Sequence, residues 1–439
     1  MHNQTREVPC SPLSSRTLAF QHMPGILFYF QMHQPYRIRR YSVFDTDGRY
    51  FDDASNAEIC RKVADKCYRP AISMLLDMAR QHTGPNAFKC AISITCTLLD
   101  QLEQHAPDVL HLLRELVNTG QCELLGETSH HSLASLYNPD EFTAQVELHS
   151  QRLRSLFGSE PCVFRNTELI YSTPIARLVA SLKRPDGSPR FRGMFAEGTP
   201  TLLSQSANPA RALNQIYAPS GVSNFGVLVR NSRLSDDIAF RFGLRSWPHW
   251  PLTADAYASW LIDASQHGPT SICMDLETFG EHQWAETGIF QFFRQLPASI
   301  FAKSQSTRFL LPSEALAEHQ PQAIIDVSEP CSWADESRDI SAWRGNAMQV
   351  HALEELYRLG RTITATLLAT ADDPVQHEAA RDMLRTWRLL TTSDHAYYMS
   401  TKGAADGQVH AYFRPFDSPY EAYISFVNVL RHMSGRFSR

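Results

Sequence analysis

Short apolar runs alternate with longer amphipathic stretches over the first three-quarters of the chain. The apolar runs, rich in Val, Ile, Phe and Cys, cover 25–32, 88–96, 121–125, 162–164, 193–196, 226–230 and 271–275. Helical patterns lie between several of them, at 57–81, 98–118, 140–156, 254–265 and 288–303. Runs with so few charges are typical of strands buried on both faces, and strands that alternate with helices form parallel sheets. The sequence therefore predicts an α/β fold: a barrel, complete or slightly irregular, over residues 25–325.

The pattern changes after Asp326. Three helices are predicted with little β signal between them, at 341–371, 374–390 and 418–434. One face of the first carries apolar residues at helical spacing, namely Leu353, Leu356, Leu359, Ile363 and Leu367. We expect residues 326–439 to form an α-helical domain that packs against the barrel as a bundle.

Composition excludes some functional classes. The chain has 439 residues, of which 43% are hydrophobic and 20% charged, so it can bury a large core without disulfides or metals. Its formal net charge is −5 and it has no long basic run. Nucleic acids and anionic membranes both select clustered Lys and Arg, so neither is expected as a partner.

The cysteines and the N-terminal segment bear on location. The nine cysteines are scattered and form no CxxC pair, which argues against a zinc knuckle and favours a reducing compartment. Residues 1–24 have no apolar core of the kind a signal peptide needs, so we interpret them as a loose tail. The apolar run GILFYF is too short to span a membrane. We expect a cytoplasmic protein; its oligomeric state stays open.

Polar residues are concentrated where four of the predicted strands end. In a parallel barrel, these carboxyl ends form the active site. The first run is followed by His33, Gln34, Tyr36 and Arg37; the third by Glu127, His130 and His131; the fourth by Arg165, Asn166, Glu168 and Tyr171; the seventh ends in Asp275 and is followed by Glu277, Glu281, His282 and Trp284.

Carboxylates beside His, Arg, Tyr and Trp suit glycoside hydrolysis. One carboxylate must be ionised to attack the anomeric carbon, and another must be protonated to donate to the leaving oxygen. Burial raises the pKa of the acid, and hydrogen-bond donors keep the nucleophile charged. Composition alone does not say which carboxylate has which role.

Five segments, in this order, resemble the α-amylase-like members of glycoside hydrolase family 57: MHQPYR, ELLGETSHHSL, FRNTELIY, MDLETFGEHQW and SDHAYYMSTKG. SDDIAFRFGLRSW and SWADESRDISAW are similar to the same subgroup. The resemblance runs from about residue 25 to the C-terminus. It implies a distorted (β/α)7 barrel followed by a C-terminal α-helical domain, and a retaining mechanism without metal or cofactor.

The resemblance also implies residue roles. Glu168 would be the nucleophile and Asp275 the general acid/base in cleaving α-1,4-glucosidic bonds of starch, glycogen or maltooligosaccharides. His33 and His131 would line the sugar subsite at the cleavage point, and Asp394 and His395 would close over it from the helical domain. The other residues that we expect to bind or support the substrate are Gln34, Glu127, Arg165, Glu277, His282, Trp284 and Trp333.

Alternatives remain at several positions. Glu168 could be an ion-pair partner of Arg165, and Ser235–Asp237 fits a helix cap better than a sugar contact. Aromatic residues common in the family are replaced at Leu276, Ala396 and Ser129–His130, which leaves the glucan chain length open. A 4-α-glucanotransferase, a branching enzyme or a non-catalytic glucan-binding protein could share the scaffold. A zinc-dependent deacetylase would need an HxxxH pair, which the chain lacks.

Overall fold

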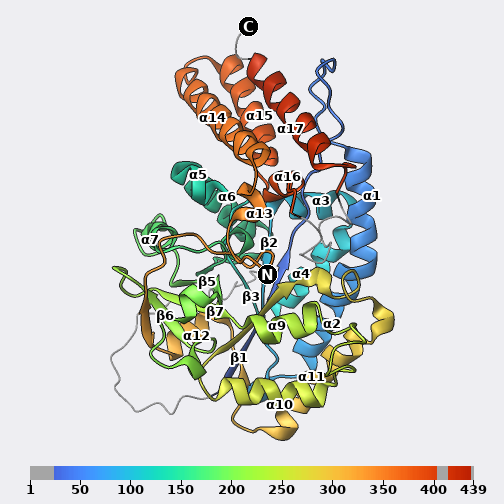
Figure 1. Ribbon diagram of the computed structural model, residues 1–439, viewed down its shortest axis with the longest axis vertical. Helices are drawn as coiled ribbons and strands as arrows, with labels where there is room; N and C mark the ends of the chain where they lie inside the picture. The colour runs from blue at the N-terminus through green and yellow to red at the C-terminus, as the bar shows by residue number, and fades with distance from the viewer. Residues whose placement is uncertain (1–23, 403–413, 437–439) are drawn as a thin grey trace, which may run out of the picture.

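The computed structural model describes residues 24–402 and 414–436, so the predicted tail lies outside the described residues apart from Pro24. A barrel forms the lower part of the molecule, and a bundle of helices from the C-terminal part of the chain lies above it (Figure 1). The last strand, β10, ends at Ile325, and from Ser341 onward the described elements are helices.

All seven predicted strands are present in the barrel, so the predicted fold class is confirmed. They are β1 (Gly25–Met32), β2 (Cys90–Ile94), β3 (Cys122–Leu124), β4 (Val163–Phe164), β5 (Gly193–Glu197), β7 (Gly226–Arg230) and β8 (Thr270–Asp275). Each pairs in parallel with its neighbours in the barrel. Their burial on both faces explains why they carry few charges.

The barrel consists of two arcs that meet at two narrow seams. One arc is β8-β1-β2-β3 and the other is β4-β5-β7. At the first seam, the isolated bridge between Gly126 and Phe164 joins the end of β3 to β4. At the second, the paired residues are Arg230 of β7 and Ser271 of β8. These seams make the barrel irregular.

Three short strands outside the barrel were not predicted. β6 (Ile216–Pro219) pairs antiparallel with β7, β10 (Ala323–Ile325) pairs in parallel with β6, and β9 (Arg308–Phe309) pairs with β1. Inside the barrel, the Tyr29 and Phe195 rings stack with centroids 5.2 Å apart. The interior is therefore a packed core, and the functional surface lies at its mouth.

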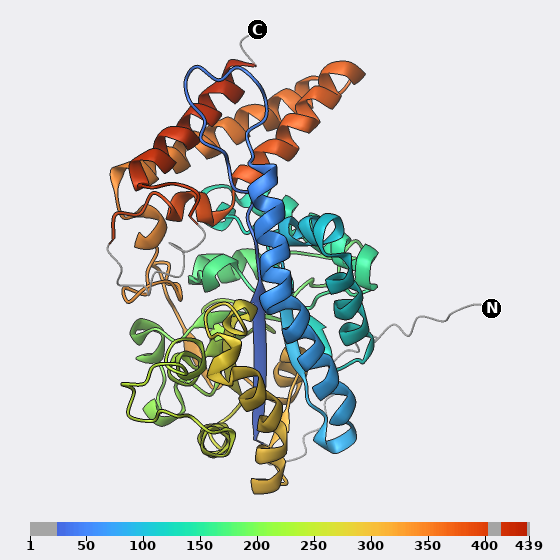
Figure 2. The same cartoon turned by 90° about the vertical axis from the view of Figure 1, so that its right-hand side faces the viewer.

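Helices cover the barrel, and two of the predicted ones are interrupted. The predicted 57–81 helix begins at Asp53 and contains a π-helix, Ala64–Tyr68, between α1 (Asp53–Val63) and α2 (Arg69–Gln81); Figure 2 shows the three as one column. The predicted 98–118 helix is two helices, α3 (Cys96–His105) and α4 (Pro107–Asn118), because Pro107 opens a new helix.

The remaining barrel-side helices are α5 (Ala134–Tyr137), α6 (Pro139–Phe157), α7 (Thr173–Ser181), α8 (Pro200–Leu203), α9 (Ser232–Ala239), α10 (Ala254–Ser265), α11 (Ile289–Lys303) and α12 (Pro312–Glu318). The C-terminal helices are α13 (Ser341–Arg344), α14 (Ala347–Ala369), α15 (Pro374–Leu390), α16 (Ser393–Tyr397) and α17 (Pro419–Gly435). None of the helices in the described ranges is long and apolar enough to cross a membrane.

The helical bundle is joined to the barrel mouth by main-chain contacts. Helices α14 and α15 pack closely where Trp387 lies over Gly360, and the Trp387 indole donates to the Leu356 carbonyl at 2.8 Å. Before α16, Thr392 forms an antiparallel bridge with Ser132, and the Ser393 amide donates to the His131 carbonyl at 2.9 Å. The start of α16 is thereby fixed beside the loop that follows β3.

Candidate active site

A cavity of about 440 Å³ opens at the carboxyl ends of the barrel strands. Its walls come from the ends of β1, β4, β7 and β8, from the loop after β10, and from α16 of the helical bundle. Ten of the thirteen predicted site residues line it: His33, Gln34, His131, Arg165, Glu168, Asp275, Glu277, His282, Trp333 and Asp394.

Glu168 lies in a strained turn directly after β4. Its φ is 57°, and the following Leu169 has φ 50°, so two consecutive non-glycine residues adopt the left-handed conformation. Each costs on the order of 1–2 kcal/mol and persists only where surrounding contacts hold it. The turn directs the Glu168 carboxylate into the cavity.

Three side chains from outside β4 contact the Glu168 carboxylate. The Trp333 indole N–H donates to Oε2 at 2.7 Å, and His131 Nε2 lies 3.2 Å from Oε1. The Ser393 hydroxyl donates to Oε1 at 3.4 Å. Donors of this kind favour the ionised carboxylate, which is the form that attacks as a nucleophile.

His131 lies between two carboxylates. Burial lowers its pKa, but hydrogen bonds to Glu127 and Glu168 outweigh burial, and the pKa rises to about 9. Its Nδ1 lies 3.6 Å from Glu127 Oε2 and 3.3 Å from Arg165 Nη1. When protonated, His131 donates from both nitrogens; when neutral, Nδ1 can accept from Arg165 while Nε2 still donates to Glu168. Glu168 therefore keeps this donor in either state.

Glu127 is fully buried one layer behind the cavity. It accepts a hydrogen bond from the Ser93 hydroxyl at 2.7 Å, and Arg165 Nη1 lies 3.8 Å from its Oε2. Burial raises its pKa, but His131, Arg165 and His149 together bring the pKa below its usual value. Glu127 is thus an ionised partner that orients His131, although it does not line the cavity.

The raised pKa of His131 makes a testable contribution to stability. Because the folded-state pKa of about 9 exceeds the unfolded value of about 6.5, this contribution is fully present below pH 6.5 and is lost as the pH rises through 9. We expect the unfolding free energy of wild type to exceed that of His131→Gln at low pH. Between pH 6.5 and 9 this difference should fall by about 3 kcal/mol, as measured by urea unfolding. A pH-independent margin for His131→Gln would contradict the prediction.

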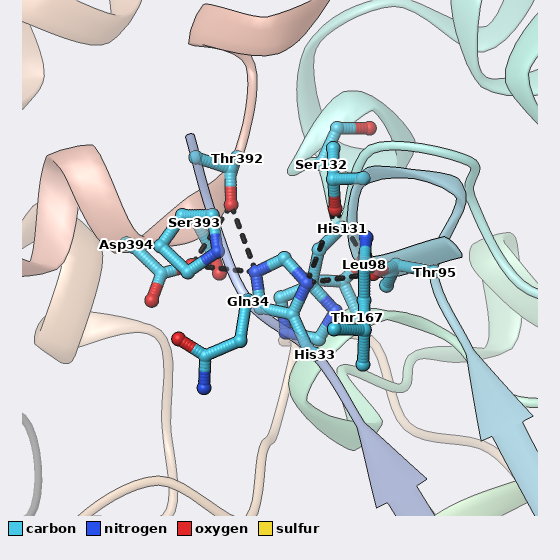
Figure 3. A network of polar contacts seen from close by, with 12 residues as sticks. His33, Gln34, Thr95, Leu98, His131, Ser132, Thr167, Thr392, Ser393 and Asp394 are labelled. Carbon is cyan, nitrogen blue, oxygen red and sulfur yellow. Dashed lines mark hydrogen bonds and ion pairs between the residues drawn. The ribbon is translucent and has the colours of Figure 1, made fainter. Parts of the chain in front are cut away.

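His33 connects the barrel to the helical bundle (Figure 3). Its Nδ1 lies 2.9 Å from the Thr95 hydroxyl, and its Nε2 lies 3.0 Å from Asp394 Oδ2. Its ring stacks on His131 with centroids 4.1 Å apart. Burial and the neighbouring His131 lower the pKa of His33 to about 4 against the opposing effect of Asp394, so His33 is neutral beside a protonated His131.

Asp275 and Glu277 form a pair of carboxyl groups on the opposite arc. Asp275 ends β8, and both side chains line the cavity. The Tyr68 hydroxyl of the π-helix donates to Glu277 Oε1 at 2.5 Å. Burial first, and then the charge of Asp275, raise the pKa of Glu277 to about 8. The pair therefore retains a proton in neutral solution, which an acid catalyst at this point needs.

Besides Glu127, two predicted residues are not brought into the cavity. Trp284 is 63% exposed on the surface, with Lys66 Nζ 5.9 Å from its ring centroid. His395 is buried, but its ring packs near Phe426, with centroids 5.4 Å apart. Neither lines the cavity, whereas the adjacent Asp394 does. Successive residues on a helix point in different directions, so α16 presents one of the pair to the site.

A charged cluster in the cavity wall was missed. Arg230, at the end of β7, contacts Glu197 at 3.2 Å and Asp236 at 2.5 Å, and Arg338 contacts the same Asp236 at 3.2 Å. The predicted helix cap at Ser235–Asp237 is wrong, because Asn231 caps α9 and Asp236 lies inside that helix. The strand-end rule would have found Arg230, the last residue of its strand; Arg338 carried no such signal.

No cluster of three or more His, Cys, Asp or Glu side chains suited to a metal ion occurs within the ranges that the structure describes. Positive charge near Glu168 comes from His131, in contact with its carboxylate, and from Arg165. Arg165 is fully buried between Glu127 and the Trp333 ring, whose centroid lies 5.3 Å from its guanidinium carbon.

Comparison with known proteins identifies the family. The family model described as Glycosyl hydrolase family 57 matches residues 27–328. The chain belongs to glycoside hydrolase family 57. It is therefore a glycoside hydrolase, and this family 57 chain is 40% identical over 415 residues to a Methanocaldococcus jannaschii protein described as "Putative alpha-amylase". That match covers 92% of the chain and 83% of the relative.

Solved structures of family 57 enzymes share the fold. A branching enzyme from Thermococcus kodakaraensis has a TM-score of 0.64 at 14% identity, covering 94% of both chains. An α-amylase from Thermotoga maritima has a TM-score of 0.60 at 14% identity, covering 94% of this chain and 96% of its own. At this identity the likeness concerns the fold: a distorted (β/α)7 barrel with a helical C-terminal region.

Proposed function

We propose that this family 57 enzyme hydrolyses α-1,4-glucosidic bonds in starch, glycogen or maltooligosaccharides with retention of configuration. The observation that carries the proposal is the single cavity that Glu168 and Asp275 both line, one from each arc of the barrel. The 40% identical relative described as "Putative alpha-amylase" supports the choice of substrate.

In this proposal, Glu168 attacks the anomeric carbon and forms a covalent glycosyl-enzyme. The hydrogen bonds from Trp333 and His131 support this role, because they favour the ionised carboxylate. The strained turn supports it as well. Surrounding contacts, and not the local preference of the backbone, hold the carboxylate in its position.

Asp275 is the general acid/base. It donates a proton to the glycosidic oxygen in the first step and removes one from the incoming water in the second. The neighbouring Glu277 supports this role because the pair holds a proton in neutral solution. His33, Gln34, Arg165, His282 and Asp394 would hydrogen-bond the sugar hydroxyls in the same cavity.

The test is incubation with a panel of maltooligosaccharides and glycogen, with products separated by chromatography and the first-formed anomer identified by ¹H NMR. Shorter products with the α-anomer formed first are expected. Products longer than maltotriose from a maltotriose substrate would instead indicate a 4-α-glucanotransferase, and new branch points would indicate a branching enzyme. Glucan binding with no bond cleavage would refute the enzyme assignment of this site.

Glu277 should set the alkaline limit of activity. In wild type we expect the alkaline limb of the kcat/KM profile near pH 8, where the pair loses its proton. Glu277→Gln removes the adjacent negative charge that favours retention of this proton, so the limb should move to lower pH. Glu281→Gln, in the same loop but outside the cavity lining, should leave the limb in place. An unmoved limb in Glu277→Gln would contradict the coupling.

We also propose a cytoplasmic location. The cysteines in the described ranges are free, among them the buried Cys60, Cys90 and Cys273, and free thiols in this number are typical of a reducing compartment. Fractionation of the native cells with detection of the protein would test the proposal.

A further inference from the structure

The loop 332–338, which follows β10, lies against the nucleophile from outside the barrel. The Ser332 hydroxyl and the Trp333 amide donate to the Glu168 carbonyl at 2.9 and 3.2 Å. The Trp333 indole donates to the Glu168 carboxylate at 2.7 Å. One short segment therefore contacts both the main chain and the side chain of the strained residue.

Arg338 holds the other end of this loop. Its Nη1 donates to the Trp333 carbonyl at 2.8 Å, and its Nη2 donates to Asp236 Oδ2 of α9 at 3.2 Å. Nη1 also lies 3.5 Å from Glu197 Oε1, at the end of β5. The guanidinium thus connects Trp333, which contacts Glu168, to the carboxylates of Asp236 and Glu197 on the same arc.

The loop has little intrinsic preference for this shape. Asp335 and Arg338 have φ of 47° and 53°, so the loop contains two left-handed non-glycine residues. Such conformations cost energy and need contacts to hold them. The contacts of Arg338 connect Trp333 to α9 and β5. The Arg338 side chain is about one-quarter exposed, so solvent can fill the space left when it is shortened.

We propose that Arg338 is a positioning residue for the nucleophile: by binding Asp236 and the Trp333 carbonyl, it fixes the indole that holds the Glu168 carboxylate. The proposal rests on the assignment of Glu168 as the nucleophile. Arg338 acts through Trp333, so loss of either side chain should lower kcat through the same contact and leave KM nearly unchanged.

The first readout is spectroscopic and needs no substrate. In protein labelled with ¹⁵N-tryptophan, Trp333→Phe identifies the Trp333 indole resonance. We expect Arg338→Met to shift or broaden this resonance and Arg338→Lys, which keeps one donor, to restore it in part. Arg241→Met is the matched control, because Arg241 is similarly exposed and pairs with Asp237 on α9 but does not line the cavity. An unchanged indole resonance in Arg338→Met overturns the proposal.

The second readout is a double-mutant cycle on kcat. Trp333→Phe and Arg338→Met should each lower kcat by about 10-fold or more, and the double variant should be no worse than Trp333→Phe alone. Effects that multiply would show that Arg338 acts independently of Trp333 and would overturn the proposal. If the enzyme cleaved no glucan at all, the proposed function would fail, whereas the indole resonance would still test the link between Arg338 and Trp333.

Discussion

Glu168→Gln should abolish glucan cleavage, lowering kcat on the order of 10⁴-fold or more. The amide has nearly the same shape as the carboxylate and can still accept the Trp333 hydrogen bond, but it cannot attack the anomeric carbon. The measurement is reducing-sugar release from maltooligosaccharides, with thermal unfolding as a check that the fold persists.

Two comparisons make the Glu168 result specific. The loss should be equally large on an aryl α-maltooligoside with an acidic phenol leaving group, because no covalent intermediate can form on either substrate. Glu354→Gln, which alters an exposed glutamate on α14, should keep wild-type turnover. If the kcat of Glu168→Gln were within 10-fold of wild type, Glu168 would not be the nucleophile.

Asp275→Asn should produce a loss that depends on the leaving group. General acid catalysis typically contributes about 10²–10⁴-fold, so cleavage of natural glucans should fall by that amount. An acidic phenol departs without protonation, so cleavage of the activated aryl glycoside should fall far less in the glycosylation step. The ratio of the two rates, measured under single-turnover conditions, is the decisive quantity.

Asp255→Asn provides the control, because Asp255 lies on the surface of α10 and pairs with Lys303. It should leave the ratio unchanged. Equal losses of Asp275→Asn on both substrates would mean that Asp275 does not protonate the leaving oxygen, and Glu277 would then be the candidate acid.

Much of the site could be predicted because parallel strands end at a common mouth. The patterns of β4 and β8 predict that Arg165, Glu168 and Asp275 lie at this mouth. The resemblance added Asp394, which lies 3.0 Å from His33 although 361 residues separate them. No local pattern contains such a contact, since it depends on how the bundle packs on the barrel.

Side-chain direction and tertiary contacts could not be predicted from the sequence. His395 follows Asp394 on α16, and consecutive helical residues point to different sides, so adjacency in the motif did not place both in the cavity. Arg338 lies in SWADESRDISAW, but the resemblance gave it no role, because its contact with Asp236 depends on the shape of a loop with left-handed residues. The π-helix that brings Tyr68 to Glu277 was likewise hidden in a continuous helical pattern.

The two seams of the barrel bear on how firmly the catalytic groups are held relative to each other. Glu168 follows the strand at one seam, and Asp275 ends the strand at the other, so the two residues belong to different arcs. Main-chain hydrogen bonds stiffen each arc internally but contribute little across a seam. Side-chain contacts between the arcs therefore contribute to the stiffness of the gap between nucleophile and acid. The His131–Glu168 contact crosses the first seam, and the hydrogen bond from Arg230 Nε to the Cys273 carbonyl crosses the second. Substitutions of these side chains can change the separation of the nucleophile and the acid without disturbing the sheet.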